Sequence, residues 1–144
     1  MHPYPHVYKI NAAAGNLGTV TLGAANLPGL ESAPPPEFDG PEGYWSPESL
    51  LCAAVADCFV LTFRAIARAS RFDWTRLECQ VEGTLDRVER VSKFVSFRTR
   101  ATLEVATGAD VTKARALLAK AEHDCLISNS LTGVRSLEAN IRGA

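Results

Sequence analysis

The segment "SPESLLCAAVADCFVLTFRAIARAS", residues 46–70, decides how this chain folds. Serine can cap a helix and proline is favoured at the first helical position, so Ser46 and Pro47 predict a helix that runs to about Ser70. Its first half is apolar on nearly every side, and its arginines come later, where they suit a helix C-terminus. Because an all-apolar helix must be covered on every side, we expect a second subunit to cover part of it.

Length and composition predict one globular domain, residues 1–144. The chain is 47% hydrophobic and its formal net charge is −1. That balance gives no reason to expect nucleic acid or an anionic membrane surface as a partner, and no basic patch is interleaved with aromatic residues.

Targeting and membrane signals are weak in this sequence. The start "MHPYPHVYKI" has no basic region followed by an apolar run, so we expect a cytoplasmic protein. The longest apolar run, residues 50–63, contains Asp57 and is shorter than the ~18–20 residues of a membrane span. We therefore expect a buried helix and no membrane insertion.

The segments around the central helix predict an α+β fold. Six of the eight prolines lie in residues 28–47, which predicts an extended loop without helix or central strand. Alternating apolar residues predict strands elsewhere, and Asp110 opens an amphipathic helix. The expected elements are strands at 7–12, 18–23, 77–85, 95–105 and 134–141, a charged connection at 86–93 and a second helix at 110–125.

Metal, hydrolase and nucleotide chemistry find little support. His2 and His6 lie in a proline-rich terminus, and His123 with Cys125 lacks the paired spacing of a zinc site. There is no GxSxG motif for a serine hydrolase. The stretch "AAGNLGTV" has neither a GxGxxG motif nor a following helix.

The four cysteines are the remaining candidates for chemistry. Cysteine is among the most buried residue types, so Cys52 and Cys79 are interpreted as small core residues. In one helix Cys52 lies six residues before Cys58, a rise of ~9 Å to nearly the opposite face, so these two cannot form a disulfide.

Cys58 and Cys125 stand apart because of their neighbours. Cys58 follows Asp57, an acid that is costly to bury without a partner. Cys125 has Ser128 and Asn129 beside it, which is a polar setting. The pattern alone leaves a reactive pair and two structural thiols both open.

At these residues the sequence resembles the osmotically inducible protein C / organic hydroperoxide resistance (OsmC/Ohr) family of thiol peroxidases. "SPESLLCAAVADCF" is similar to the family's (N/S)PEELLxAAxAxCF helix, and "AEHDCLISNSL" is similar to its late AxxxCPxSxxL segment. The 67 residues from Cys58 to Cys125 are close to the family spacing, and the resemblance covers nearly the whole chain.

The resemblance implies a fold and a two-cysteine mechanism. The expected fold is OsmC-like, with antiparallel sheets around a long buried central helix in an intertwined homodimer. Cys58 matches the peroxidatic position, which becomes a sulfenic acid, and Cys125 matches the resolving position, which closes a disulfide. Glu48 matches the family's active-site glutamate. A lipoyl or thioredoxin-like dithiol is the implied reductant, and no metal or organic cofactor is expected.

Two features depart from the family pattern. The family pairs its glutamate with an arginine, but the first arginine here is Arg64, and Glu37 or Asn16 stands where the two family branches carry theirs. Leu126 also replaces the proline that usually follows the resolving cysteine. Without a nearby cation the thiolate fraction should be low, and Lys93, Arg87 and Lys9 are the candidate substitutes.

The leading hypothesis is a peroxidase for organic hydroperoxides. An alternative is an OsmC-fold protein with little peroxidase activity that binds a small apolar ligand, and a third is a redox sensor. Turnover with a dithiol distinguishes the first from the others.

Overall fold

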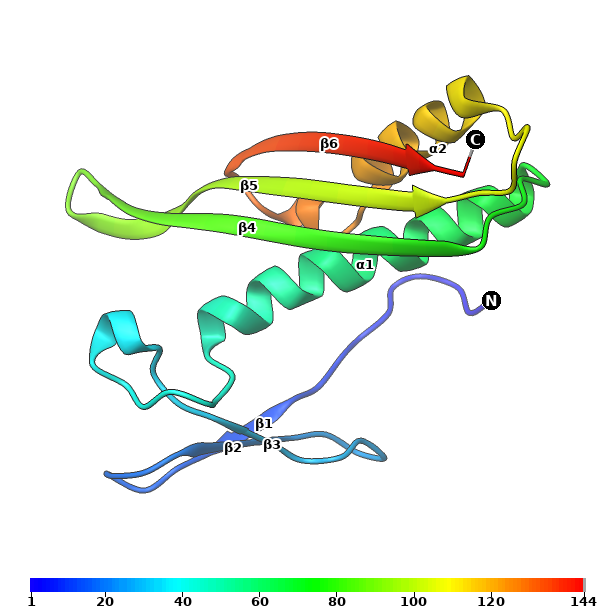
Figure 1. Ribbon diagram of the computed structural model, residues 1–144. Coiled ribbons are helices and arrows are strands. Elements are labelled where there is room, and N and C mark those ends of the chain that lie inside the picture. The colour runs from blue at the N-terminus through cyan, green and yellow to red at the C-terminus, as the bar shows by residue number, and fades with distance from the viewer. Residues whose placement is uncertain (144) are drawn as a thin grey trace. The chain divides into compact units, whose positions relative to one another are not determined.

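The computed structural model describes residues 1–143, which form two α-helices and two three-stranded sheets (Figure 1). The predicted α+β class is confirmed. The chain divides into two compact units, residues 1–50 and the residues from Leu51 onward. The single-domain interpretation stays a prediction.

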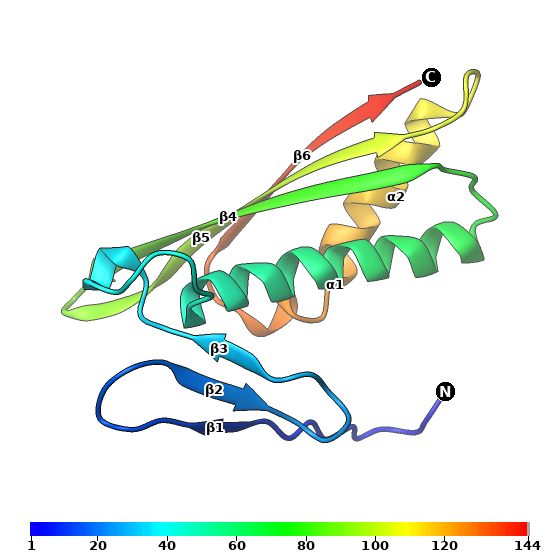
Figure 2. The ribbon, with the colours of Figure 1, turned by 60° about the horizontal axis from the view of Figure 1, so that its bottom comes forward.

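The first unit contains an antiparallel sheet of β1 (Asn11–Ala13), β2 (Val20–Gly23) and β3 (Leu30–Ser32), in that order (Figure 2). The hydroxyls of Thr19 and Thr21 donate to the Glu31 carboxylate, which ties β3 to the strand beside it.

The proline-rich segment is more ordered than the sequence predicted. The expectation of a loop over residues 28–47 was wrong for β3 and for the 3-10 helix η1 (Pro36–Phe38). β3 ends at Ser32, before the run of prolines, so its own N–H groups are available to the sheet. Proline is tolerated at the start of η1 because a first-turn N–H has no partner within the helix.

Helix α1 (Pro47–Ala69) begins and ends within one residue of its predicted limits. Ser46 and Ser49 cap its N-terminus reciprocally. The Ser49 N–H donates to Ser46 Oγ at 3.1 Å, and the Ser46 N–H donates to Ser49 Oγ at 2.8 Å. Each serine therefore satisfies a backbone donor that the helix leaves free.

One stripe of α1 is buried, at four-residue spacing: Val55, Phe59, Phe63 and Ala67. Only 22% of its most apolar 18-residue window, of mean hydropathy 2.0, is buried in the single chain. Within residues 1–143, α1 is the one helix that is long and apolar enough to cross a membrane by length and composition. The core helix of a soluble protein passes the same test.

The second unit contains β4 (Arg76–Val88), β5 (Val91–Glu104) and β6 (Val134–Arg142), with β5 in the centre. β4 and β5 are antiparallel, whereas β6 runs parallel to β5 after the crossover helix α2 (Val111–Asp124) (Figure 1). The expectation of purely antiparallel sheets was therefore wrong here, because a helical crossover brings the chain back in the same direction.

The β4–β5 hairpin is longer than expected. The predicted connection at 86–93 shrinks to Glu89 and Arg90, both with positive φ as a tight hairpin turn requires. A bulge shifts the register between Thr84, which pairs with Ser96, and Leu85, which pairs with Phe94. Leu85 is exposed although alternation placed it inward, as is the whole end of β4 from Thr84 onward.

The core of the second unit lies between its sheet and its helices. Phe63 of α1, Leu103 of β5 and Leu118 of α2 are all fully buried in one cluster. Asp110 caps α2 by accepting a hydrogen bond from the Lys113 N–H at 2.9 Å. This cap fixes the start of α2, and Cys125 is the residue directly after its last turn.

Candidate functional site

Cys58 lies on α1 beside the buried stripe and is itself half-buried. Its Sγ is 3.8 Å from Thr62 Oγ1, one helical turn further on. The neighbouring Asp57 is exposed, so the idea that an acid is buried next to this thiol was wrong. Because successive residues point about 100° apart on a helix, the acid can face solvent while the thiol faces the protein.

Cys125 directly follows α2 and is 1% exposed. Its Sγ lies 4.0 Å from the carbonyl oxygen of Val55, which precedes Cys58 by about one turn of α1. The expectation that Cys125 lies outside the core was therefore wrong. The chain turns sharply after α2, so that Leu126 is exposed while Cys125 and Ser128 are buried.

The thiols of Cys58 and Cys125 are neighbours and are not bonded to each other. Burial raises the pKa of Cys125, hydrogen bonds from Ser128 lower it, and the Cys58 thiol raises it further. A buried thiol loses the hydration that stabilises its thiolate. The fold thus brings together the two cysteines that the sequence singled out, while their roles stay a prediction.

Cys79 is a third thiol near this pair. It faces inward from β4 against the core, as its strand alternation predicted. Burial raises its pKa to about 11, and the charge of the Cys125 thiolate contributes in the same direction. The alternation of β4 predicts which face of the sheet Cys79 occupies, but not that the end of α2 packs on that face. The sequence therefore contained no signal for the proximity of Cys79 and Cys125.

The raised pKa of Cys79 predicts slow alkylation. At pH 8 a pKa of about 11 leaves ~0.1% thiolate, against ~10% for an ordinary thiol, and only the thiolate reacts. We expect Cys79 to react with iodoacetamide about 100-fold more slowly in the folded protein than in urea, and its rate to rise with pH throughout the range 7–9. Peptide mapping of timed samples measures both rates. Equal rates in the two conditions would contradict the burial of Cys79.

Cys52 is half-buried and packs against Gly83 of β4. A Cβ added at Gly83 would come within 2.7 Å of its Sγ and 2.9 Å of the Phe94 ring, so only glycine leaves room for these two side chains. Burial raises the pKa of Cys52, and the Gly83 backbone hydrogen bond lowers it. This supports the interpretation of Cys52 as a structural thiol.

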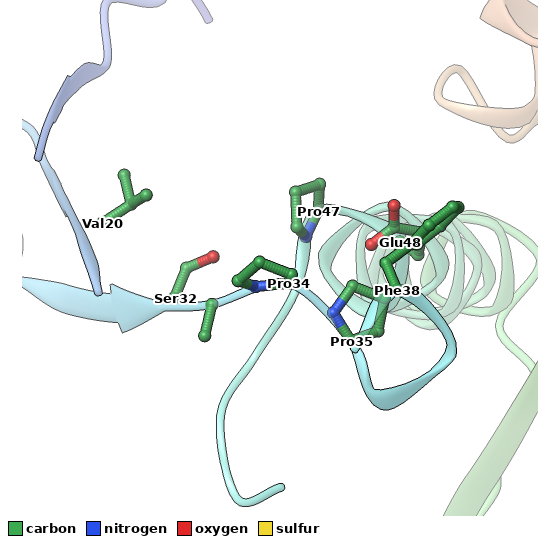
Figure 3. A pocket seen from close by; sticks show the side chains of 8 residues that line it. Val20, Ser32, Pro34, Pro35, Phe38, Pro47 and Glu48 are labelled. Carbon is green, nitrogen blue, oxygen red and sulfur yellow. The ribbon is translucent and has the colours of Figure 1, made fainter. Parts of the chain in front are cut away.

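Glu48 lies in the first unit, in the first turn of α1, where an acidic side chain suits the helix dipole. It lines a pocket of about 310 Å³ together with Ser32 and the apolar residues Val20, Ala33, Pro34, Pro35, Phe38 and Pro47. Figure 3 shows the Glu48 carboxylate between the side chains of Pro47 and Phe38 in this view.

One carboxylate oxygen of Glu48 is unsatisfied. Its Oε2 is buried and has no hydrogen-bond partner within residues 1–143. A buried polar atom without a partner costs about 1–3 kcal/mol, so a donor that reached this oxygen would be stabilised there. The role of Glu48 in the site stays a prediction.

Over the described part of the chain, no group of three or more His, Cys, Asp or Glu side chains could hold a metal ion. The polar contacts of Cys58 and Cys125 are with the Thr62 hydroxyl and the Val55 carbonyl.

Comparisons with known proteins connect this arrangement to a family. The family model described as OsmC-like protein matches residues 40–138, a range that includes Glu48, Cys58 and Cys125. An uncharacterized protein of Bacillus subtilis, YmaD, is 29% identical over 143 residues, with 95% of each chain covered.

Solved structures give the same fold. An organic hydroperoxide resistance protein OsmC from Legionella pneumophila is 26% identical, with a TM-score of 0.76 and with 96% of this chain and 98% of that one covered. An OsmC-like protein of unknown function from Vibrio cholerae is 14% identical, with a TM-score of 0.83 and with 94% and 99% covered. The second likeness concerns the fold alone.

Proposed function

The chain belongs to the OsmC-like protein family, and on this premise we propose that it is a thiol-dependent peroxidase that reduces organic hydroperoxides. The observation that carries the proposal is the proximity of the two thiols: Cys58 influences the pKa of Cys125, and Cys125 Sγ lies 4.0 Å from the Val55 carbonyl oxygen, one turn of α1 before Cys58. The name of the Legionella pneumophila protein, an organic hydroperoxide resistance protein, supports the substrate class.

The proposed reaction begins at Cys58. Its thiolate attacks one oxygen of the peroxide, the O–O bond breaks, and the alkoxide takes up a proton and leaves as an alcohol. The sulfur is now a sulfenic acid. The half-buried position of Cys58 on α1 lets a substrate reach the sulfur.

Cys125 completes the proposed cycle. Its sulfur attacks the sulfenic sulfur of Cys58, a disulfide forms, and the hydroxyl leaves as water. Cys125 is held for this attack by the fold, because its Sγ lies 4.0 Å from the Val55 carbonyl oxygen, one turn of α1 before Cys58. An external dithiol, lipoyl or thioredoxin-like, then reduces the disulfide by exchange.

Two further parts of the proposal concern the surroundings. We propose that Glu48 organises the substrate pocket, as the family resemblance implies. We also propose a homodimer, because most of the apolar surface of α1 is uncovered in one chain. Leu61 of α1, for example, is 50% exposed. We propose that this dimer is located in the cytoplasm. Size-exclusion chromatography with light scattering tests the dimer directly.

Peroxide consumption tests the proposed function. With dithiothreitol as reductant, we expect cumene hydroperoxide to be consumed faster than hydrogen peroxide, because apolar side chains surround Cys58 on α1. The disappearance of each peroxide is followed in a ferrous–xylenol orange assay. No consumption of either peroxide above that by dithiothreitol alone would contradict the proposal.

A second candidate function rests on the Glu48 pocket. Its lining is mostly apolar, its Oε2 has no partner in residues 1–143, and the chain has no arginine before Arg64. These features suit a small apolar ligand with one hydrogen-bond donor. Cumyl alcohol has that chemistry and cannot be reduced as a peroxide. Saturable binding of it, weakened in Glu48→Gln and without peroxide turnover, would favour a binding protein.

A further inference from the structure

Arg135 of β6 holds the chain on both sides of Cys125. Its Nε donates to Glu122 Oε1 at 2.6 Å, and one terminal nitrogen donates to Asn129 Oδ1 at 2.7 Å. The other terminal nitrogen donates to the backbone carbonyl of Glu122. Glu122 lies three residues before Cys125 and Asn129 four residues after it, so one guanidinium spans the whole segment.

The backbone of this segment is tied to the same groups. The Cys125 N–H donates to the Glu122 carbonyl at 3.4 Å, so this oxygen accepts from Cys125 and Arg135 together. The Asn129 N–H donates to the Cys125 carbonyl at 2.9 Å. The last carbonyl groups of a helix have no hydrogen-bond donors within it. Arg135 supplies a donor to one of them, the Glu122 carbonyl, near the end of α2.

The ion pair between Arg135 and Glu122 is partly shielded from water. The side chains of Arg135 and Glu122 are 24% and 23% exposed, whereas those of Arg98 and Glu138 on the same sheet are each 49% exposed. The planar guanidinium has five donors in a fixed geometry, which lets it address three acceptors at once. β6 is paired along its length with β5, so Arg135 is anchored on a rigid element.

Position matters for Cys125 because disulfide formation is geometrically strict. The two Cβ atoms must come within about 3.5–4.5 Å, and small misplacements of reacting groups can cost up to about 100-fold in rate. Cys125 already lies against the turn of α1 that leads to Cys58. A loosened segment 122–129 would allow its thiol to leave that position.

We propose that Arg135 is a positioning residue for the resolving step, holding Cys125 where it can attack an activated Cys58 sulfur. The inference rests on the proposed function for its biological meaning. Arg135 does not contact the reacting sulfurs in this account, and it acts through Glu122 and Asn129. Loss of the Arg135 hydrogen bonds should therefore slow the attack of Cys125 on the Cys58 sulfur without changing the reaction of the Cys58 thiolate.

An exchange reaction separates the two steps without any peroxide. The Cys58 thiolate attacks 5,5′-dithiobis(2-nitrobenzoic acid), a mixed disulfide forms, and one thionitrobenzoate leaves. Cys125 then attacks the Cys58 sulfur, the protein disulfide forms, and the second thionitrobenzoate leaves. Absorbance gives both rates, and mass mapping of quenched samples assigns each phase to Cys58 and Cys125.

We expect Arg135→Ala to slow the second release about tenfold or more and to leave the first within about twofold. Arg135→Lys, which keeps the charge but not the fork, should recover part of the rate and serves as the test variant if Arg135→Ala does not fold. Arg115→Ala is the matched control. Arg115 also joins α2 to β6, donating to the Ala139 carbonyl at 2.8 Å, but it lies away from segment 122–129.

Two results would overturn the proposal: an unchanged second phase in folded Arg135→Ala, or an equal slowing in Arg115→Ala, which would indicate general loosening of α2. A wild-type protein that reduces no peroxide but shows the selective slowing would end the peroxidase proposal and leave the positioning role standing. The two failures are therefore distinguishable.

Discussion

Replacing Cys58 by serine is expected to lower consumption of cumene hydroperoxide to the rate of dithiothreitol alone. A serine hydroxyl is not ionised at neutral pH and cannot be converted to a sulfenic acid, so the first step has no substitute. Cys125→Ser should behave differently, because the Cys58 sulfenic acid still forms there but meets no resolving thiol. We expect dimedone to trap this sulfenic acid in Cys125→Ser as a covalent adduct, which intact-mass spectrometry measures. Cys58→Ser should give no dimedone adduct.

Cys79→Ser is the matched control for these variants. Cys79 also lies near Cys125, but burial holds its pKa at about 11 and leaves little thiolate at neutral pH. We therefore expect this variant to keep wild-type turnover within about twofold. A loss of turnover in Cys79→Ser as large as in Cys58→Ser would mean that the wrong thiol has been assigned as the nucleophile.

Phe63→Ala is expected to lower the free energy of unfolding by about 3–5 kcal/mol. The Phe63 side chain is fully buried, and its ring packs edge-to-face on Trp74 with 5.4 Å between centroids. Truncation would remove the transfer free energy of the ring and leave a cavity between α1 and the sheet. Because whole domains are stable by only about 5–15 kcal/mol, this one change should remove a large fraction of the total.

Urea denaturation followed by circular dichroism measures this loss. Val134→Ala is the comparison, since Val134 is 74% exposed at the start of β6 and its truncation should cost less than about 0.5 kcal/mol. Similar midpoints for Phe63→Ala and the wild type would contradict the core described for the second unit. A large loss in Val134→Ala would indicate that this exposed end of β6 is covered in solution.

Regular elements were largely predictable from the sequence. The Ser46–Pro47 start gave the limits of α1 to within one residue, and alternation located β4, β5 and β6. The parallel pairing of β6 with β5 was not predictable, because alternation gives a strand's faces and not its direction. The exposure of Leu85 was likewise not predictable, because alternation does not say how far along a strand the core extends.

The candidate site was predictable in part, and mainly through family resemblance. The pairing of Cys58 with Cys125 was expected, yet the reasons drawn from their neighbours were wrong: Asp57 is exposed and Cys125 is buried. Both errors arise because adjacent residues can face opposite environments. The hydrogen bonds of Arg135 to Glu122 and Asn129 depend on how β6 packs beside α2. The local sequence does not predict this tertiary packing.

Peptide mapping without reduction, after one equivalent of cumene hydroperoxide, tests whether Cys58 and Cys125 form the catalytic disulfide. The thiols are alkylated at the end of the reaction, and the protein is digested and analysed by mass spectrometry. We expect one disulfide, between Cys58 and Cys125, with Cys52 and Cys79 recovered as alkylated thiols. Recovery of Cys58 as an unoxidised thiol, or of a disulfide that omits it, would contradict the proposed two-cysteine mechanism.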